Sequence, residues 1–286
     1  MIQILEVWLI RLRLIRNVDR EVQSWLMSHH RATHKNGEVM DVDEVGFNVY
    51  SPTYEDGVLL YIFSLIGTTN RKLVDIGAGP IRASSTTNLI INHGFTGLLI
   101  DADKKNVRNL RSYYSVHPET TLFPPKCACA FVTMENVNDL IERNGVLGEI
   151  DLLGIDIDGV DYWIWKAIHV IRPRVVLVEY QDNLGPNRSW TVPYRPDFNL
   201  RDYPQNRQYN NYCGASLTAF VRLGRERGYR LVGCNRGGWN AFFVRDDLGS
   251  ECLPEVSSED CFRHDWNQFS MEQRFPPVAE MDWQEV

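Results

Sequence analysis

The sequence lacks any apolar stretch long enough to cross a membrane. Its most apolar segment near the amino terminus, residues 2–16, is interrupted by Glu6, Arg11, Arg13 and Arg16. A spanning helix needs about 20 consecutive, predominantly apolar residues. We therefore expect no membrane span and no signal peptide, and we expect a cytoplasmic protein.

Paired cysteines and an excess of positive charge are also missing. The six cysteines form no CxxC pair and show no zinc-type spacing, so we expect them to be reduced. The net charge is −7 and the pI is near 5.5, which argues against nucleic acid as the main partner. With 286 residues, 44% of them hydrophobic, the chain suits one α/β domain with additions.

The sequence does contain a nucleotide-binding βαβ pattern. Residues 73–76 include a short apolar run that ends in Gly77-Ala78-Gly79. This pattern predicts a buried parallel strand that leads into a tight turn, where the glycines let a ligand approach the backbone. A second apolar run ends in Asp101, 24 positions after Gly77. Such units place at that distance the carboxylate that holds a ribose diol.

Asp75 favours one class of nucleoside cofactor over another. A dinucleotide fingerprint has Gly or Ala three residues after its second glycine, but Arg82 stands at that position. A carboxylate at Asp75 can serve the ammonium of an amino-acid moiety or the loop amides, whereas a pyrophosphate gains nothing from it. The pattern resembles motifs I and II of class I S-adenosylmethionine-dependent methyltransferases. The alternative is a glycine turn in another kind of α/β domain.

Strand-like and helix-like segments alternate along the chain. This alternation predicts an α/β fold with a Rossmann-like, doubly wound sheet of seven strands whose last strand is antiparallel. The predicted strands are residues 73–76, 97–100, 126–132, 150–156, 175–180, 229–234 and 240–245. The predicted helices are residues 2–30, 58–66, 104–115, 135–143, 162–169 and 215–227, with one more ending at His93 before the stop residue Gly94.

We divide the chain into three parts. Residues 1–48 are an N-terminal helical arm, residues 49–247 a class I methyltransferase domain, and residues 248–286 a C-terminal tail that we expect to be extended and partly ordered at best. Residues 183–212 have no periodicity and are predicted to form a lid or acceptor loop. The apolar face of the arm packs on the main domain, joins two copies in a homodimer, or lies at a membrane interface.

Acidic residues gather where two predicted strands end. Asp156, Asp158 and Asp161 follow the fourth strand, and Glu179 ends the fifth. Both ends belong to the carboxyl edge of the sheet, where open α/β sheets bind ligands. Three roles stay open. The carboxylates bind Mg²⁺ or another divalent cation, or one is a general base, or Asp156 serves the cofactor while the others cap the next helix.

We assign candidate roles accordingly, with Asp158 as first choice for the base or metal ligand. His169 ranks below it as a helix-terminal residue. The candidate catalytic residues are Asp158, Asp161 and Glu179, the candidate metal ligands are Asp156, Asp158 and Glu179, and the acceptor pocket includes Tyr180 and Asp182.

Several of these stretches together resemble the FkbM-type family of methyltransferases. The resemblance covers about residues 51–244, and its most specific part is the segment from Asp156 to Trp165. It implies S-adenosylmethionine as cofactor and O-methylation of a sugar or another natural product. The resemblance and the sheet-edge argument together give these candidate cofactor contacts: Asp75, Gly77, Ala78, Gly79, Asp101, Ala102, Val132 and Asp156.

Two rival functions remain at this stage. Asp156-x-Asp158 after an apolar strand also resembles the DxD motif of metal-dependent glycosyltransferases. A catalytically degenerate methyltransferase-fold protein that acts as a binding or scaffold subunit is the non-enzymatic alternative. The upstream glycine turn favours the methyltransferase, because a glycosyltransferase does not need it.

Overall fold

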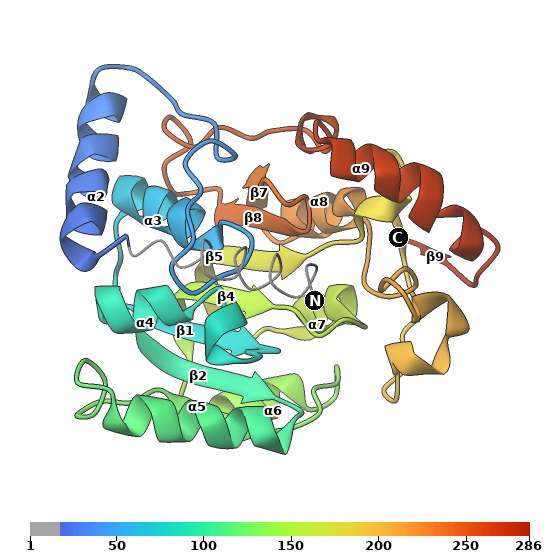
Figure 1. Cartoon of the computed structure of the whole chain (residues 1–286), viewed down its shortest axis with the longest axis horizontal. Helices are drawn as coiled ribbons and strands as arrows, with labels where there is room; N and C mark the ends of the chain where they lie inside the picture. The colour runs from blue at the N-terminus through green and yellow to red at the C-terminus, as the bar shows by residue number, and fades with distance from the viewer. Residues whose placement is uncertain (1–17) are drawn as a thin grey trace, which may run out of the picture.

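A seven-stranded sheet forms the centre of the computed structural model, which describes residues 18–286 (Figure 1). The strand order is β3-β2-β1-β4-β5-β8-β7. The first five strands in this order are parallel, and β8 runs antiparallel to both of its neighbours. The predicted doubly wound sheet with an antiparallel last strand is thus confirmed. The strands are β1 (Lys72–Ile76), β2 (Thr96–Asp101), β3 (Lys126–Cys129), β4 (Gly148–Ile155), β5 (Ile171–Glu179), β7 (Tyr229–Cys234) and β8 (Asn240–Arg245).

Helices cover both faces of this sheet. Alternate residues of β1 point to opposite faces, so that Leu73 joins one core and Val74 the other. The Leu73 core contains α3, α4 and α5, and the Val74 core contains α6, α7 and α8. The helices are α2 (Arg20–Lys35), α3 (Glu55–Ile66), α4 (Thr87–His93), α5 (Lys104–Val116), α6 (Val137–Arg143), α7 (Asp161–Ala167), α8 (Leu217–Glu226) and α9 (Asp265–Phe269).

Two strands differ from the prediction by three or more residues at one end. β3 ends at Cys129, whereas the apolar pattern predicts residue 132. β5 begins at Ile171 and includes Pro173, whereas the prediction begins at residue 175. Proline is compatible with the beginning of a strand, where one ladder hydrogen bond is dispensable.

The described part of the N-terminal arm packs on the main domain. Helix α2 lies against α3 (Figure 1), and the buried Gln23 accepts hydrogen bonds from Asn88 at 3.0 Å while contacting His93 at 2.6 Å. Arg31 donates to the carbonyl of Ser64 at 2.9 Å. Packing on the domain is thus the role of this part of the arm. The part of the predicted helix before residue 18 lies outside the described residues, and the homodimer stays a prediction.

The C-terminal tail is folded, which corrects the expectation of an extended segment. It contains α9, a π-helix (Ser270–Arg274) and β9 (Gln284–Glu285), which pairs with β6 (Trp190–Thr191) of the acceptor loop. An ion pair and aromatic contacts between isolated residues hold the tail in place. Such contacts have no periodic pattern, so the sequence did not reveal them. None of the helices within residues 18–286 combines the length and the hydropathy that crossing a bilayer requires.

Candidate active site

In the glycine turn after β1, the first position admits only a residue without a side chain. Gly77 has φ 87°, and its N–H donates to the carbonyl of Ile100 at 2.8 Å. A Cβ at this position would lie 1.7 Å from the carbonyl oxygen of Asp156. The turn is therefore locked between the ends of β2 and β4. This close approach brings the ends of β1, β2 and β4 together, and no side chain at Gly77 covers the backbone of the turn.

Asp101 holds the second half of the turn. Its carboxylate accepts hydrogen bonds from the N–H of Gly79 at 2.9 Å, from the N–H of Asp103 at 2.6 Å and from the amide of Asn106 at 3.3 Å. A carboxylate offers about four acceptor positions, so roughly one remains for a ligand hydroxyl. The position predicted for a ribose-binding carboxylate is therefore occupied by a group that also organises the loop.

Asp75 lies at the base of the same turn and is buried. Within the described residues, the only side chain that donates a hydrogen bond to it is that of Thr86, whose hydroxyl lies at 2.6 Å. Gly154 of the neighbouring strand leaves room for it, because a Cβ there would lie 2.9 Å from the Asp75 carboxylate. Burial raises the pKa of Asp75 to about 6, the Thr86 hydrogen bond opposes this rise, and the charge of Asp101 adds to it. A ligand cation beside this carboxylate would favour its ionised form.

The remaining predicted cofactor contacts surround this turn. The N–H of Ala78 donates to Ile100 at 3.0 Å, and Ala102 is exposed directly after β2. The N–H of Ala130 donates to the carbonyl of Asp101 at 3.1 Å, which brings the segment after β3 beside the turn. Val132, two residues further on, is buried in the core. The structure thus brings the backbone of these residues to one edge of the sheet, as the prediction requires.

Three carboxylates converge beyond the turn. Asp156, Asp158 and Glu179 each offer an oxygen atom, and these atoms lie within 4.8 Å of one another. Asp156 is exposed to solvent, whereas Asp158 and Glu179 are partly buried. Limited solvation first, and repulsion by neighbouring carboxylates second, raise the pKa of Asp156 and of Glu179 well above the ordinary range. Such a group favours a shared proton or a bound cation.

Asp158 faces the acceptor loop. Its carboxylate accepts a hydrogen bond from the amide of Asn210 at 2.6 Å, and burial raises its pKa while that bond opposes the rise. Its backbone is left-handed, with φ 52°, a conformation that Asp tolerates better than most residues. Asp161 has a different setting, because its carboxylate accepts the N–H groups of Ile157 at 2.8 Å and Gly159 at 2.9 Å. Asp161 thereby fixes the loop that carries Asp158.

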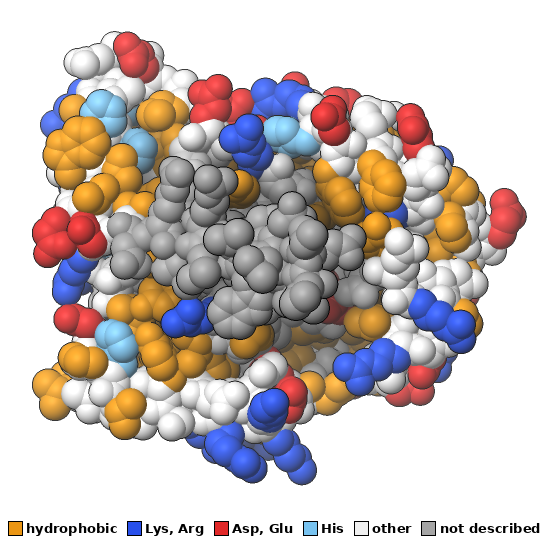
Figure 2. All heavy atoms as spheres, viewed as in Figure 1, with side chains coloured by type: hydrophobic (Ala, Val, Ile, Leu, Met, Phe, Trp, Pro, Cys, Tyr) orange, Lys and Arg blue, Asp and Glu red, His pale blue; other side chains and the backbone are white. Residues whose placement is uncertain are grey.

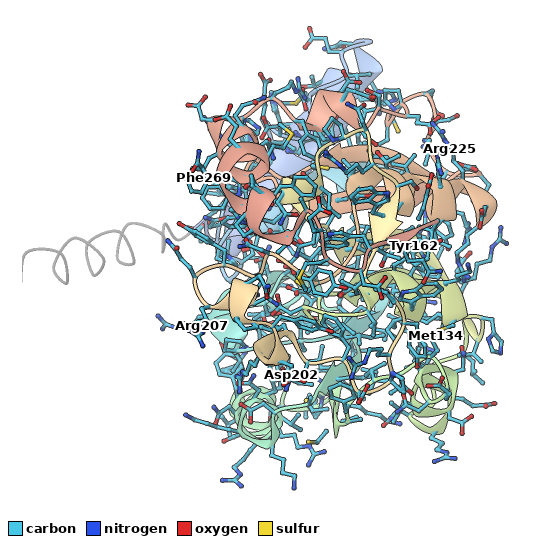
Figure 3. The ribbon with its side chains drawn as sticks, turned by 90° about the vertical axis from the view of Figure 1, so that its right-hand side faces the viewer. Met134, Tyr162, Asp202, Arg207, Arg225 and Phe269 are labelled. Carbon is cyan, nitrogen blue, oxygen red and sulfur yellow. The ribbon has the colours of Figure 1, made fainter. Side chains whose placement is uncertain are left out.

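Tyr180 and Asp182 are both inside the protein. Tyr180 is 1% exposed and its ring lies 6.0 Å from that of Phe262 in the tail. Asp182 forms an ion pair with Arg274 at 2.8 Å. Figure 3 views this side of the molecule, with Asp202 of the acceptor loop below Phe269 of the tail. The contact of Tyr180 and Asp182 with an acceptor molecule stays a prediction. His169 is exposed in the loop before β5, at the opposite edge of the sheet.

Sequence reasoning missed the residues that support the site. Glu55 is completely buried at the start of α3 and accepts hydrogen bonds from the amides of Asn235 at 2.7 Å and Asn240 at 2.6 Å. Asn240 pairs with Glu179 across β5 and β8. The signal was present, since an asparagine stands at each facing end of the last two strands. Asn210 and Arg274 carried no comparable signal.

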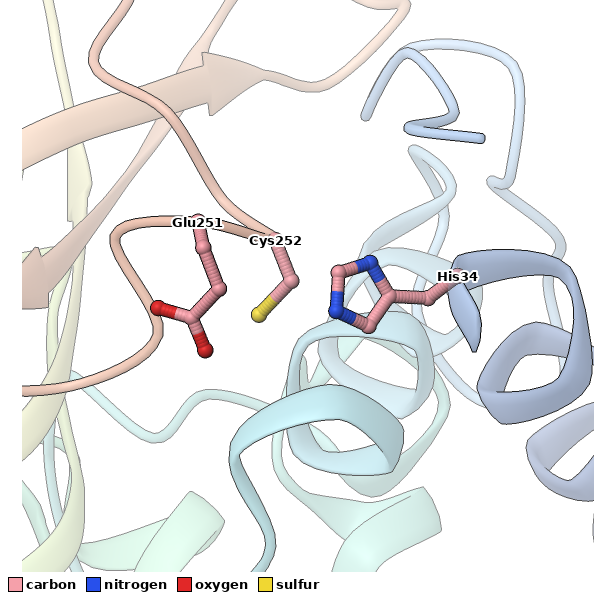
Figure 4. A group of neighbouring side chains, drawn as sticks. All are labelled: His34, Glu251 and Cys252. Carbon is pink, nitrogen blue, oxygen red and sulfur yellow. The ribbon is translucent and has the colours of Figure 1, made fainter. Parts of the chain in front are cut away.

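A second group of possible metal ligands lies between α2 and the tail (Figure 4). Oxygen, sulfur and nitrogen atoms of Glu251, Cys252 and His34 lie within 4.8 Å of one another. The thiol of Cys252 donates to the carbonyl of Gly249 at 3.3 Å, and burial followed by the charge of Glu251 raises its pKa. The protonated thiol is thus the favoured form here. This group is separate from the carboxyl edge, and we assign it no role in the candidate site.

No protein-family model matches the chain, and no curated protein matches it. Among solved structures it is similar to an O-methyltransferase from Bacillus cereus in complex with SAH, with 14% identity, 76% of this chain and 88% of that chain covered, and a TM-score of 0.42. It is also similar to a putative caffeoyl-CoA O-methyltransferase from Staphylococcus aureus, with 15% identity, 85% of this chain and 99% of that chain covered, and a TM-score of 0.42. A putative O-methyltransferase from Klebsiella pneumoniae has 15% identity, with 65% of this chain and 78% of that chain covered, and a TM-score of 0.35. Similarity at this level carries no argument about chemistry, which rests on the residues of this chain.

Proposed function

We propose that the protein is an S-adenosylmethionine-dependent methyltransferase that methylates a hydroxyl group of a small molecule. One observation carries this proposal. The turn from Gly77 to Gly79, the carboxylates of Asp75 and Asp101 and the acidic group around Asp158 share the carboxyl edge of a doubly wound sheet. A nucleoside with an amino-acid moiety has complementary groups for the turn, for Asp75 and for Asp101, and the acidic group beside them is left for the acceptor.

The residues of the turn fit such a cofactor. Asp75 is a buried carboxylate with a raised pKa, and a cationic ammonium beside it would lower that pKa. Asp101 can still accept a hydrogen bond from a ribose hydroxyl. The bare backbone at Gly77 and Gly79 allows close approach. The bound cofactor would supply a methyl group that its positive sulfur already activates. Positioning of the acceptor and removal of its proton are left to the protein.

Asp158 is the residue that we propose as general base. Its pKa is raised from the ordinary value of an aspartate in the direction of neutral pH, which suits a base that takes a proton and later releases it. Asn210 orients the carboxylate, and Asp161 fixes its loop. Asp156 and Glu179 next to it would share a proton, or would hold a divalent cation such as Mg²⁺, which would supply a positive charge for the acceptor hydroxyl. Residues 183–212 would enclose the small-molecule acceptor.

Calorimetry of the full chain tests the cofactor assignment. We expect S-adenosylhomocysteine to bind and a nucleoside-diphosphate sugar with Mn²⁺ not to bind. The reverse result would establish the glycosyltransferase alternative, and binding of neither would favour a scaffold. Titration with Mg²⁺, and EDTA added to an active preparation, separate the two roles of Asp156 and Glu179. Unchanged turnover in EDTA excludes the cation.

A further inference from the structure

A basic groove lies at the edge of the sheet opposite the candidate active site. It has a volume of about 270 Å³ and is bounded by α2, α3, α4 and the loops that precede β1 and β2. These three helices lie together on the left of Figure 1. Among the described residues, three arginines line the groove, Arg20, Arg31 and Arg71, and no acidic residue does. A concentration of positive charge in a protein of net charge −7 calls for an anionic counterpart.

The arginines are only partly neutralised within the described part of the chain. Arg20 pairs with Glu119 at 3.1 Å, and both side chains are about half exposed. Arg31 and Arg71 form no ion pair among residues 18–286, and the only side-chain bond of Arg31 there is the one to the carbonyl of Ser64. Burial, followed by the charges of Arg20 and Arg71, lowers the pKa of the lining residue His93 to about 4. The groove is thus cationic even though its histidine is neutral.

The backbone of Arg71 is held in an unusual conformation. Its φ is 52°, which glycine or asparagine adopts more readily than arginine. The buried carboxylate of Asp151 imposes it, because the carboxylate accepts the N–H groups of Thr69 at 2.9 Å, Asn70 at 3.0 Å and Arg71 at 2.6 Å. The tip of the Arg71 guanidinium lies 3.7 Å from where a Cβ of Gly94 would stand, beside the loop that precedes β2. Asp151 thereby fixes the backbone from which this guanidinium reaches the groove.

Apolar side chains lie beneath the groove but offer it little surface. Leu60 and Phe63 of α3, Leu89 of α4 and Phe95 of the following loop line it, and all four are at most 4% exposed. Ser24, Thr68 and Asn92 add neutral hydrogen-bonding groups at the rim. The surface of the groove is therefore mainly polar, which suits a charged ligand.

We propose that this groove binds a small anion, with a phosphate or carboxylate group between Arg31 and Arg71 and further polar groups at the rim. Arginine suits both anions because its guanidinium donates two parallel hydrogen bonds. The loops that form the groove enter β1 and β2 at their amino ends, whereas the candidate cofactor turn leaves β1 at its carboxyl end. The site is thus distinct from the proposed methyl-transfer site and does not depend on it.

Calorimetry with phenyl phosphate and with inorganic phosphate, on the full chain at constant ionic strength, tests the proposal. We expect both compounds to bind, because the phosphate group that they share is the part that the arginines recognise. Arg71→Asn and Arg31→Met should each weaken binding at least tenfold. The matched control is Arg143→Ala, which removes an exposed arginine of α6 and should leave the affinity unchanged.

Arg71→Asn also separates loss of binding from loss of folding. Asparagine accepts the left-handed backbone, so the midpoint of thermal unfolding without ligand should stay the same or rise. Equal affinities in the wild type and in Arg71→Asn, or no heat with either phosphate compound, would overturn the proposal. Arginine-dependent binding to phosphatidylserine vesicles without binding of phenyl phosphate would overturn it in favour of a lipid surface. S-adenosylhomocysteine binding should be unaffected by either substitution.

Discussion

Replacement of Arg274 by methionine tests how the folded tail closes the candidate site. Arg274 is buried, as is its partner Asp182, with side chains 7% and 1% exposed and 2.8 Å between them. The same guanidinium donates to the side chain of Asn211 at 3.0 Å and to the carbonyl of Asn210 at 3.3 Å. Asn210 in turn donates to Asp158. One side chain of the tail thus connects to the proposed base through two hydrogen bonds.

The expected cost of Arg274→Met follows from this burial. Removing one partner of a buried ion pair leaves the other charge uncompensated, which costs about 3–5 kcal/mol. A domain of ordinary stability has about 5–15 kcal/mol in total, so the variant would lose a large share of it. The double variant with Asp182→Asn leaves no buried charge, and we expect it to be more stable than the sum of the two single losses predicts.

Urea unfolding followed by circular dichroism and by tryptophan fluorescence measures these losses. Arg225→Met is the matched control, because Arg225 pairs with Glu255 at 2.9 Å but the two side chains are 62% and 41% exposed. Its loss should stay below about 1 kcal/mol. If Arg274→Met lowers the free energy of unfolding no more than this control does, or if the losses of the two single variants simply add, then Arg274 does not hold the tail to the loop.

Three further predictions concern the carboxyl edge. Gly77→Ala should abolish S-adenosylhomocysteine binding in calorimetry, because the new Cβ would lie 1.7 Å from a carbonyl oxygen. The control is Gly37→Ala, at a position with φ 85° and open space around it, which should lower the stability by only about 1 kcal/mol and leave the affinity unchanged. The affinity for S-adenosylhomocysteine should fall about tenfold between pH 7 and pH 5, because Asp75, with a pKa of about 6, binds the ammonium only when ionised; a pH-independent affinity, or a pH-dependent one in Asp75→Asn, would exclude this role. Asp158→Asn should retain that affinity and lower turnover about 100-fold or more; normal turnover would remove Asp158 from catalysis.

The sequence was sufficient to predict the sheet and several of the residues that meet at its carboxyl edge. Buried parallel strands produce local apolar runs, and a turn with two glycines shows where a backbone must come close to another. Gly77, Asp75 and Asp101 could be placed for this reason. Each of these residues acts through the few residues around it, so its neighbours in the chain contain the signal.

The parts that could not be predicted depend on contacts between distant segments. Arg274 and Asp182 meet across 92 positions, and Glu55 meets Asn240 across 185. A single arginine in a polar tail gives no periodicity, so its buried partner is invisible in the sequence. The predicted lid, residues 183–212, was identified by its lack of pattern, but the tail that fastens it was not.

The clamp between tail and loop also has a consequence for biosynthesis. Arg274 is added to the growing polypeptide 63 residues after Asn211, which takes several seconds at about 5–20 residues per second. The last strand of the sheet, β8, ends at Arg245, so only during the final 29 positions of this interval does the nascent chain have all seven strands but nothing to fasten the segment over Asp158. Maturation is thus completed from the carboxyl-terminal side, and a premature stop between Arg245 and Arg274 would release a protein that contains its whole sheet yet stays open at the candidate site.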